Sequence, residues 1–88
     1  MPTSVVGGMI GTVTPADILA FEAANPHHTP TRAERIRREL GITPIRYFVL
    51  LKRAASSAEG IAADAITARR VRDQMAARAA ERARRTAA

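Results

Sequence analysis

Residues 35–54, RIRRELGITPIRYFVLLKRA, constrain the fold of this chain more than any other segment. They predict one helix that ends at Leu40, a three-residue break that begins at Gly41, and a second helix that begins at Thr43 and Pro44. Threonine is a common N-cap, proline is common at the first helical position, and glycine often ends a helix in the left-handed conformation. A break this short between two helices is typical of a helix-turn-helix.

The apolar positions around Gly41 also fit a helix-turn-helix. In such a unit the two helices touch near their crossing, so apolar side chains are needed at fixed offsets from the turn glycine. The chain has an apolar residue at each of these offsets: Ile36, Leu40, Ile42, Tyr47 and Leu50. The position four before the glycine usually holds alanine and is Arg37 here. We expect this side chain to point outward, or the helix crossing to be wider.

A further helix is predicted ahead of this unit. Thr14 and Pro15 form the same cap and first-turn pair as Thr43 and Pro44, and apolar residues follow at helical spacing. The helix stops at Asn25, because a residue before proline is disfavoured in the helical region.

An alanine- and arginine-rich helix is predicted at the other end of the chain. Asp64 is its expected N-cap, and the composition favours a helix towards residue 82. Gly60 is expected to loosen the chain before it, after a third helix that ends near residues 55–57.

These elements predict an all-α fold, a four-helix small domain that contains a helix-turn-helix and carries a basic C-terminal helix. The expected layout has a flexible N-terminal arm at residues 1–13 and a helical domain at residues 14–64, with the helix-turn-helix at about residues 31–55. An arginine-rich C-terminal helix or tail follows at residues 65–88.

Length and composition fit one small cytoplasmic domain. A chain of 88 residues has no room for two independent cores. It has no cysteine, which suits a reducing cytoplasm. No apolar run is long enough to span a membrane, and the first residues do not resemble a secretory signal. Because many apolar residues are alanine, we expect the core to rest on a few larger side chains: Ile18, Leu19, Phe21, Ile36, Leu40, Ile42, Tyr47, Phe48, Leu50 and Leu51.

The charge is unevenly distributed. The formal net charge is +6, and residues 67–88 hold seven arginines against two acidic residues. A basic segment beside a compact domain favours a polyanionic partner, because neutralised phosphates release their counterions. The alternative is a solvated arginine-rich helix with no partner.

The helical wheel of the second helix predicts which residues face a partner. With Tyr47, Leu50 and Leu51 inward, the outer face consists of Thr43, Ile45, Arg46, Val49, Lys52 and Arg53. Arg46 can bond a guanine edge, and Thr43 can reach a base or a phosphate. Phosphate contacts are expected from the remaining basic residues: Lys52, Arg53, Arg32, Arg35, Arg69, Arg70 and Arg72. The alternative is that Arg46 is an ordinary surface arginine and Val49 belongs to the core.

The sequence holds no arrangement of residues that predicts catalysis. Its N-terminal glycines precede no lysine and helix of the form that a phosphate-binding loop needs. Two adjacent histidines, His27 and His28, cannot both face one ion from a regular helix, and no other ligand is close in sequence. We therefore predict a protein that is not an enzyme and has no cofactor and no metal site.

Three motifs resemble a small family of unknown function from actinobacteria and their phages. They are the ILAFE segment at residues 18–22, the helix end at residues 35–41, and the TPIRYFVLL segment at residues 43–51. The resemblance covers about residues 17–85. It implies a helix-turn-helix-like core similar to the promoter-reading domain of sigma factors. Matching residues are Phe21, Glu22, Arg46, Tyr47, Phe48 and Leu50. Where the family often has glutamine this chain has Val49, which leaves one base-reading side chain fewer.

The prediction is a small helix-turn-helix protein that binds double-stranded DNA, a transcriptional or phage regulatory protein with a possible homodimer. The alternative is a protein-interaction module that docks on host machinery such as RNA polymerase or a regulator, with Ile45 and Val49 in an apolar patch. A third possibility is a capsid- or terminase-associated phage protein with a basic tail.

Overall fold

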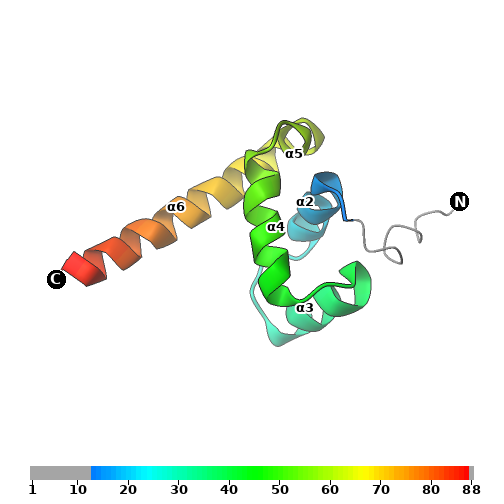
Figure 1. Ribbon diagram of the computed structural model, residues 1–88, viewed down its shortest axis with the longest axis horizontal. Helices are drawn as coiled ribbons and strands as arrows, with labels where there is room; N and C mark the ends of the chain where they lie inside the picture. Colours follow the sequence, from blue (N-terminus) through cyan, green and yellow to red (C-terminus); the bar gives the residue numbers. More distant parts are fainter. Residues whose placement is uncertain (1–12, 88) are drawn as a thin grey trace, which may run out of the picture.

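The computed structural model describes residues 13–87, and every regular element in this range is helical (Figure 1). Five α-helices occur there, and one of them continues directly into a π-helical segment, η1. In chain order the elements are α2 (Pro15–Ala24), α3 (Pro30–Arg35), η1 (Ile36–Leu40), α4 (Pro44–Ser56), α5 (Ala58–Ala63) and α6 (Ala65–Ala87). The prediction of an all-helical protein is therefore confirmed. Of the expected arm at residues 1–13, all but Val13 lies outside the described residues.

Threonine followed by proline begins three of these helices, and for two of them, at Thr14 and Thr43, the sequence analysis above predicts this start. Thr14, Thr29 and Thr43 each have extended backbone angles, and each hydroxyl oxygen accepts a hydrogen bond of 3.1 Å from the backbone N–H three residues later. The bond satisfies one of the backbone donors that a helix start leaves free. At Thr14 the carboxylate of Asp17 also accepts from the backbone N–H of Thr14, which completes a capping box.

The break between η1 and α4 is built on a left-handed glycine. Gly41 has φ 70° and ψ 22°, the only positive φ among the residues that the structure describes. Its N–H donates to the carbonyl of Arg37 at 3.2 Å. Arg37 itself is exposed, as its predicted outward orientation requires. The last five residues of this helical segment are wound as a π-helix, a form that occurs mostly as short local segments.

The expected count of four helices is wrong because residues 58–63 form the short helix α5. Ser57 caps it, since its hydroxyl accepts from the N–H of Gly60 at 2.9 Å. Gly60 does not loosen the chain. It is buried against the end of α4, where a Cβ atom would lie 2.0 Å from the carbonyl oxygen of Ala54. Glycine at this position therefore allows α5 to pack directly on the backbone of α4.

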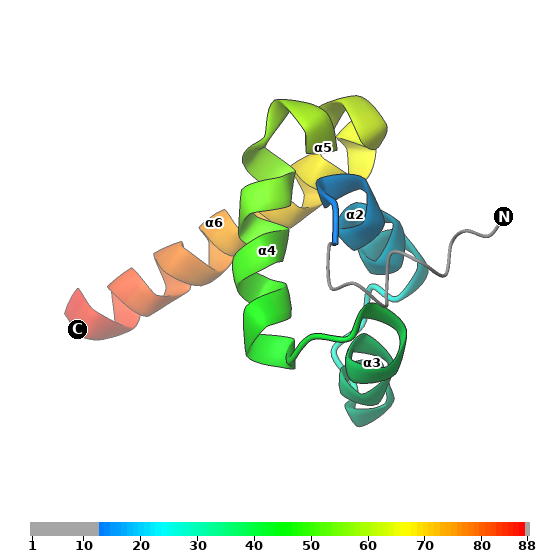
Figure 2. The same ribbon diagram turned by 45° about the vertical axis from the view of Figure 1, so that its right-hand side comes forward.

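Helix α4 lies at the centre, with α2 and α5 packed against it and α6 crossing it (Figures 1 and 2). The buried core consists of Ile18, Leu19, Phe21, Ile36, Tyr47, Leu51, Ala54, Ala55, Ala68 and Val71. Phe48, which we expected in the core, lies at its edge and is 36% exposed. Helix α6 begins in this core and then projects away from the other helices, which gives the molecule extents of 53 × 29 × 18 Å. No helix among residues 13–87 is both long and apolar enough to cross a membrane.

Substitution of Gly60 by alanine is expected to lower the free energy of unfolding by about 2 kcal/mol, within the usual cost of overpacking. The reason is the contact with the carbonyl of Ala54, because backbone atoms must move to admit a methyl group. In an ordinary helix interior the same change stabilises by about 1 kcal/mol. Urea unfolding followed by circular dichroism measures the difference, and an unchanged or higher stability would contradict the close packing of α5 on α4.

Candidate nucleic-acid interface

The outer face of α4 contains the residues that the helical wheel placed there. Ile45, Arg46 and Val49 are exposed on the side opposite to the buried Tyr47 and Leu51. Thr43, Lys52 and Arg53 are exposed as well. The face is more apolar than a typical base-reading surface, because Ile45 is 79% exposed and Val49 is 40% exposed. Val49 is therefore not a core residue.

Arg32 does not lie on the outer surface, and that prediction is wrong. Its side chain is 4% exposed, and its Nη2 donates to Oε1 of Glu22 at 2.8 Å. Its guanidinium carbon lies 5.2 Å from the ring centroid of Tyr47. The physical reason is helical spacing, since Arg32 lies four residues before the buried Ile36 and thus on the same face of the helix. Arginine is rarely buried unless it is paired, so the sequence alone predicts an exposed side chain here.

Glu22 is the centre of a buried polar network. Besides the contact with Arg32, its Oε1 accepts a hydrogen bond of 2.6 Å from the hydroxyl of Tyr47. Burial, together with the bond and charge of Glu22, raises the pKa of the Tyr47 phenol, so this hydroxyl stays a donor. Arg70 approaches from α6, with its Nη2 3.9 Å from Oε2 of Glu22 and 3.3 Å from its backbone carbonyl oxygen. The network therefore joins α2, α3, α4 and α6.

Three more of the predicted phosphate contacts have partners within the chain. Arg35 is half-exposed and bonds to Glu39 at 2.7 Å and to the side-chain oxygen of Asn25 at 2.8 Å. Arg72 donates to the carbonyl oxygen of Ala55 at 2.5 Å, near the C-terminal end of α4. Arg69 is exposed, and its contact with Asp73 is loose at 3.9 Å. Of the predicted arginines on α6, Arg69 is thus the most available to a partner.

A cationic corner lies between α4 and the projecting half of α6, and the sequence analysis did not identify it. A hollow of 380 Å³ is lined there by Lys52 of α4 and by residues of α6 that include Met75, Arg78 and Arg82. No carboxylate among residues 13–87 forms a salt bridge with any of the three basic side chains. Helical spacing could have revealed the corner, because Arg78 and Arg82 continue the stripe that Val71 and Met75 begin.

His28 connects the corner to the α3–α4 side of the molecule. Its ring stacks on Phe48, with centroids 5.4 Å apart and planes 8° from parallel. Its Nε2 lies 2.9 Å from Nη2 of Arg78. Arginine has only donors, so this histidine nitrogen accepts and the ring is neutral. Burial, with the nearby charges of Arg32 and Arg78, lowers the pKa of His28.

Comparison with known proteins places the chain in a family. Residues 12–83 match the family model DUF3263, described as a protein of unknown function. The chain belongs to this family. The match covers all the residues of the buried network and extends into the cationic corner. Searches among curated proteins and among solved structures give no match.

Substitution of Glu22 by glutamine is expected to lower the free energy of unfolding by about 3 kcal/mol. The amide cannot compensate the buried charge of Arg32, and an uncompensated buried charge is strongly destabilising. Glu39→Gln is the matched control, because it breaks an exposed ion pair with Arg35, which is worth less than about 1 kcal/mol. Denaturant unfolding of both variants checks this. Equal losses would contradict a central role for Glu22.

Acidification is expected to weaken the fold through His28. Its pKa is lowered on folding, so the unfolded chain binds more protons just below pH 6.5. The contribution of neutral His28 is therefore complete above that pH and is lost as the pH falls. Thermal unfolding between pH 7.5 and 5 should show a steeper loss for the wild type than for His28→Phe, which keeps the ring stack but does not titrate. Parallel profiles would contradict this role of His28.

Proposed function

We propose that this protein binds double-stranded DNA and acts as a small transcriptional or phage regulatory protein. In this proposal α3 with η1 is the first helix of a helix-turn-helix, Gly41 is the turn residue, and α4 is the helix presented to the major groove. The short left-handed turn and the exposed outer face of α4 support the assignment.

The cationic corner is the observation that carries the proposal. Lys52, Arg78 and Arg82 line one hollow without a carboxylate in salt-bridge contact among the described residues. Unpaired like charges that share a hollow repel one another, and a polyanion relieves this repulsion. Phosphates on a DNA strand are regularly spaced, and each one that is neutralised releases counterions. A row of phosphates is therefore a suitable occupant of the angle between α4 and α6.

The projecting part of α6 extends this basic surface away from the domain (Figure 1). It is composed largely of alanine and arginine, two strong helix formers, so it can remain helical without packing against a core. Arg85 continues the basic side of the helix beyond Arg78 and Arg82. Glu81 lines the same hollow as Arg78, Arg82 and Arg85, and its carboxylate pairs with Arg84.

The outer face of α4 has a separate role in this proposal. Arg46 and Arg53 have no salt-bridge partner among residues 13–87, and Arg46 has the donor geometry to contact a guanine edge. The hydroxyl oxygen of Thr43 already accepts a bond in its cap, so it can act toward DNA as a donor. Ile45 and Val49 can contact thymine methyl groups. Sequence preference is expected to be modest, with most affinity from phosphates.

The expected result with a 30-base-pair duplex is binding that weakens steeply as salt rises. If four phosphates are neutralised, the slope of log K against log salt is about −3.6. The double variant Lys52→Gln, Arg82→Gln should flatten this slope by about 2. Fluorescence anisotropy between 50 and 300 mM KCl measures it.

The matched control is Arg37→Gln, Arg38→Gln, which removes the same charge from the exposed surface of η1. It should change the slope by less than half as much as the corner variant. An equal effect of the two pairs would contradict the corner as the phosphate site. Absence of binding at 50 mM KCl would contradict DNA binding altogether.

A further inference from the structure

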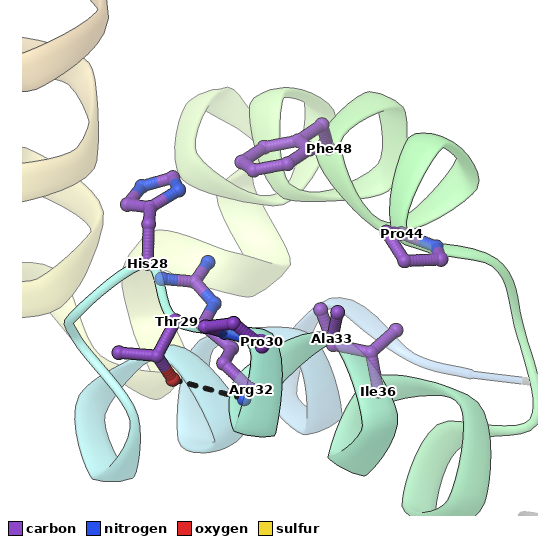
Figure 3. Close-up of a pocket in the computed structure, with 8 residues that line it drawn as sticks. All are labelled: His28, Thr29, Pro30, Arg32, Ala33, Ile36, Pro44 and Phe48. Atoms are coloured by element: carbon purple, nitrogen blue, oxygen red, sulfur yellow. Dashed lines mark hydrogen bonds between the residues drawn. The ribbon is translucent and has the colours of Figure 1, made fainter.

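A second hollow, of 290 Å³, lies between α3 and the first two turns of α4 (Figure 3). Its apolar lining comes from Pro30, Ala33, Ile36, Pro44 and Phe48. Figure 3 shows the Phe48 ring beside His28 at one end and Pro44 at the other, with Ala33 and Ile36 on the opposite wall. Arg46 and Val49 do not line this hollow.

The polar part of this hollow is positively charged. Arg32 lines it, is 4% exposed, and has a buried Nη1 without a hydrogen-bond partner in the structure. The guanidinium groups of Arg32 and Arg70 share the single carboxylate of Glu22, so the network keeps one excess positive charge. Arg78, bonded to His28 beside the hollow, adds another. An apolar site with this charge favours an occupant that combines apolar and acidic groups.

Exposed apolar side chains extend the site along α4. Phe48 forms one wall of the hollow, and Ile45 and Val49 lie exposed on the neighbouring surface of the same helix. A small molecule inside the hollow would leave Ile45 and Val49 in water. A helix laid along α4 can insert one side chain and cover these two with others at helical spacing.

We infer that this groove, formed by the hollow with Ile45 and Val49, binds an acidic amphipathic segment of a partner protein. One large apolar side chain of the segment fills the hollow against Phe48, and carboxylates lie toward Arg78 and Arg46. The apolar anchor supplies affinity and the charges select the acidic partner. Arg46 is also part of the proposed DNA surface. If the protein binds DNA as proposed, the acidic segment and DNA therefore compete for it.

Selection from a displayed library of random 16-residue peptides tests the groove without DNA. Peptides enriched on the wild-type protein are expected to be acidic, with aromatic or aliphatic residues at three- and four-residue spacing. Ala33→Phe, which fills the hollow, should weaken the selected peptides at least tenfold. Ile45→Glu should also weaken the binding of these peptides at least tenfold. It should leave the core intact, because this side chain is 79% exposed.

Ile66→Glu is the matched control, since Ile66 is 84% exposed and lies on α6 outside the groove. It should change peptide affinity less than twofold, and circular dichroism checks that each variant is folded. The inference is overturned if no peptide is enriched, if the enriched peptides are not acidic, or if Ile45→Glu and Ile66→Glu weaken them equally. These outcomes do not depend on DNA binding, so the two proposals can fail separately.

Discussion

The rest of the structure depends on one buried carboxylate. Glu22 of α2 accepts from Arg32 of α3 and from Tyr47 of α4, and Arg70 of α6 reaches both its side chain and its backbone carbonyl. A small core of seven larger apolar residues and three alanines does little to fix the angles between the helices. Hydrogen bonds to a single carboxylate do fix these angles, because each donor must approach the carboxylate oxygens from a particular direction. This matters most for α3, whose buried residue is Arg32.

Much of the fold could be predicted because it follows from local rules. Thr14, Thr29 and Thr43 begin helices through the same hydrogen bond, and Gly41 ends one through its left-handed backbone. The failures have a different origin. The sequence predicts flexibility at Gly60, whereas its role depends on the carbonyl of Ala54 six residues away. A close contact between two helices, such as that of α5 with α4, leaves no signal in the local sequence pattern.

The candidate site was harder to predict, for a related reason. The sequence gives the number of arginines but does not say which of them have partners inside the protein. Arg32 and Arg70 hold Glu22, and Arg72 bonds the end of α4, so three of the predicted phosphate contacts stabilise the fold. The outer face of α4 was predictable, since one helix and its wheel define it. Helical spacing places Arg78 and Arg82 on the same side of α6 as Met75, but the presence of Lys52 beside them depends on the angle between α4 and α6.

The hollow and the cationic corner meet at one bond, between His28 and Arg78. Arg78 lines the corner, and His28 and Phe48 line the hollow. On the two proposals, a phosphate at the corner and a carboxylate beside the hollow both use the guanidinium of Arg78. We therefore expect the two proposed sites to be coupled through Arg78 even where their occupants do not touch. By thermodynamic linkage, each occupant changes the binding affinity of the other by the same factor.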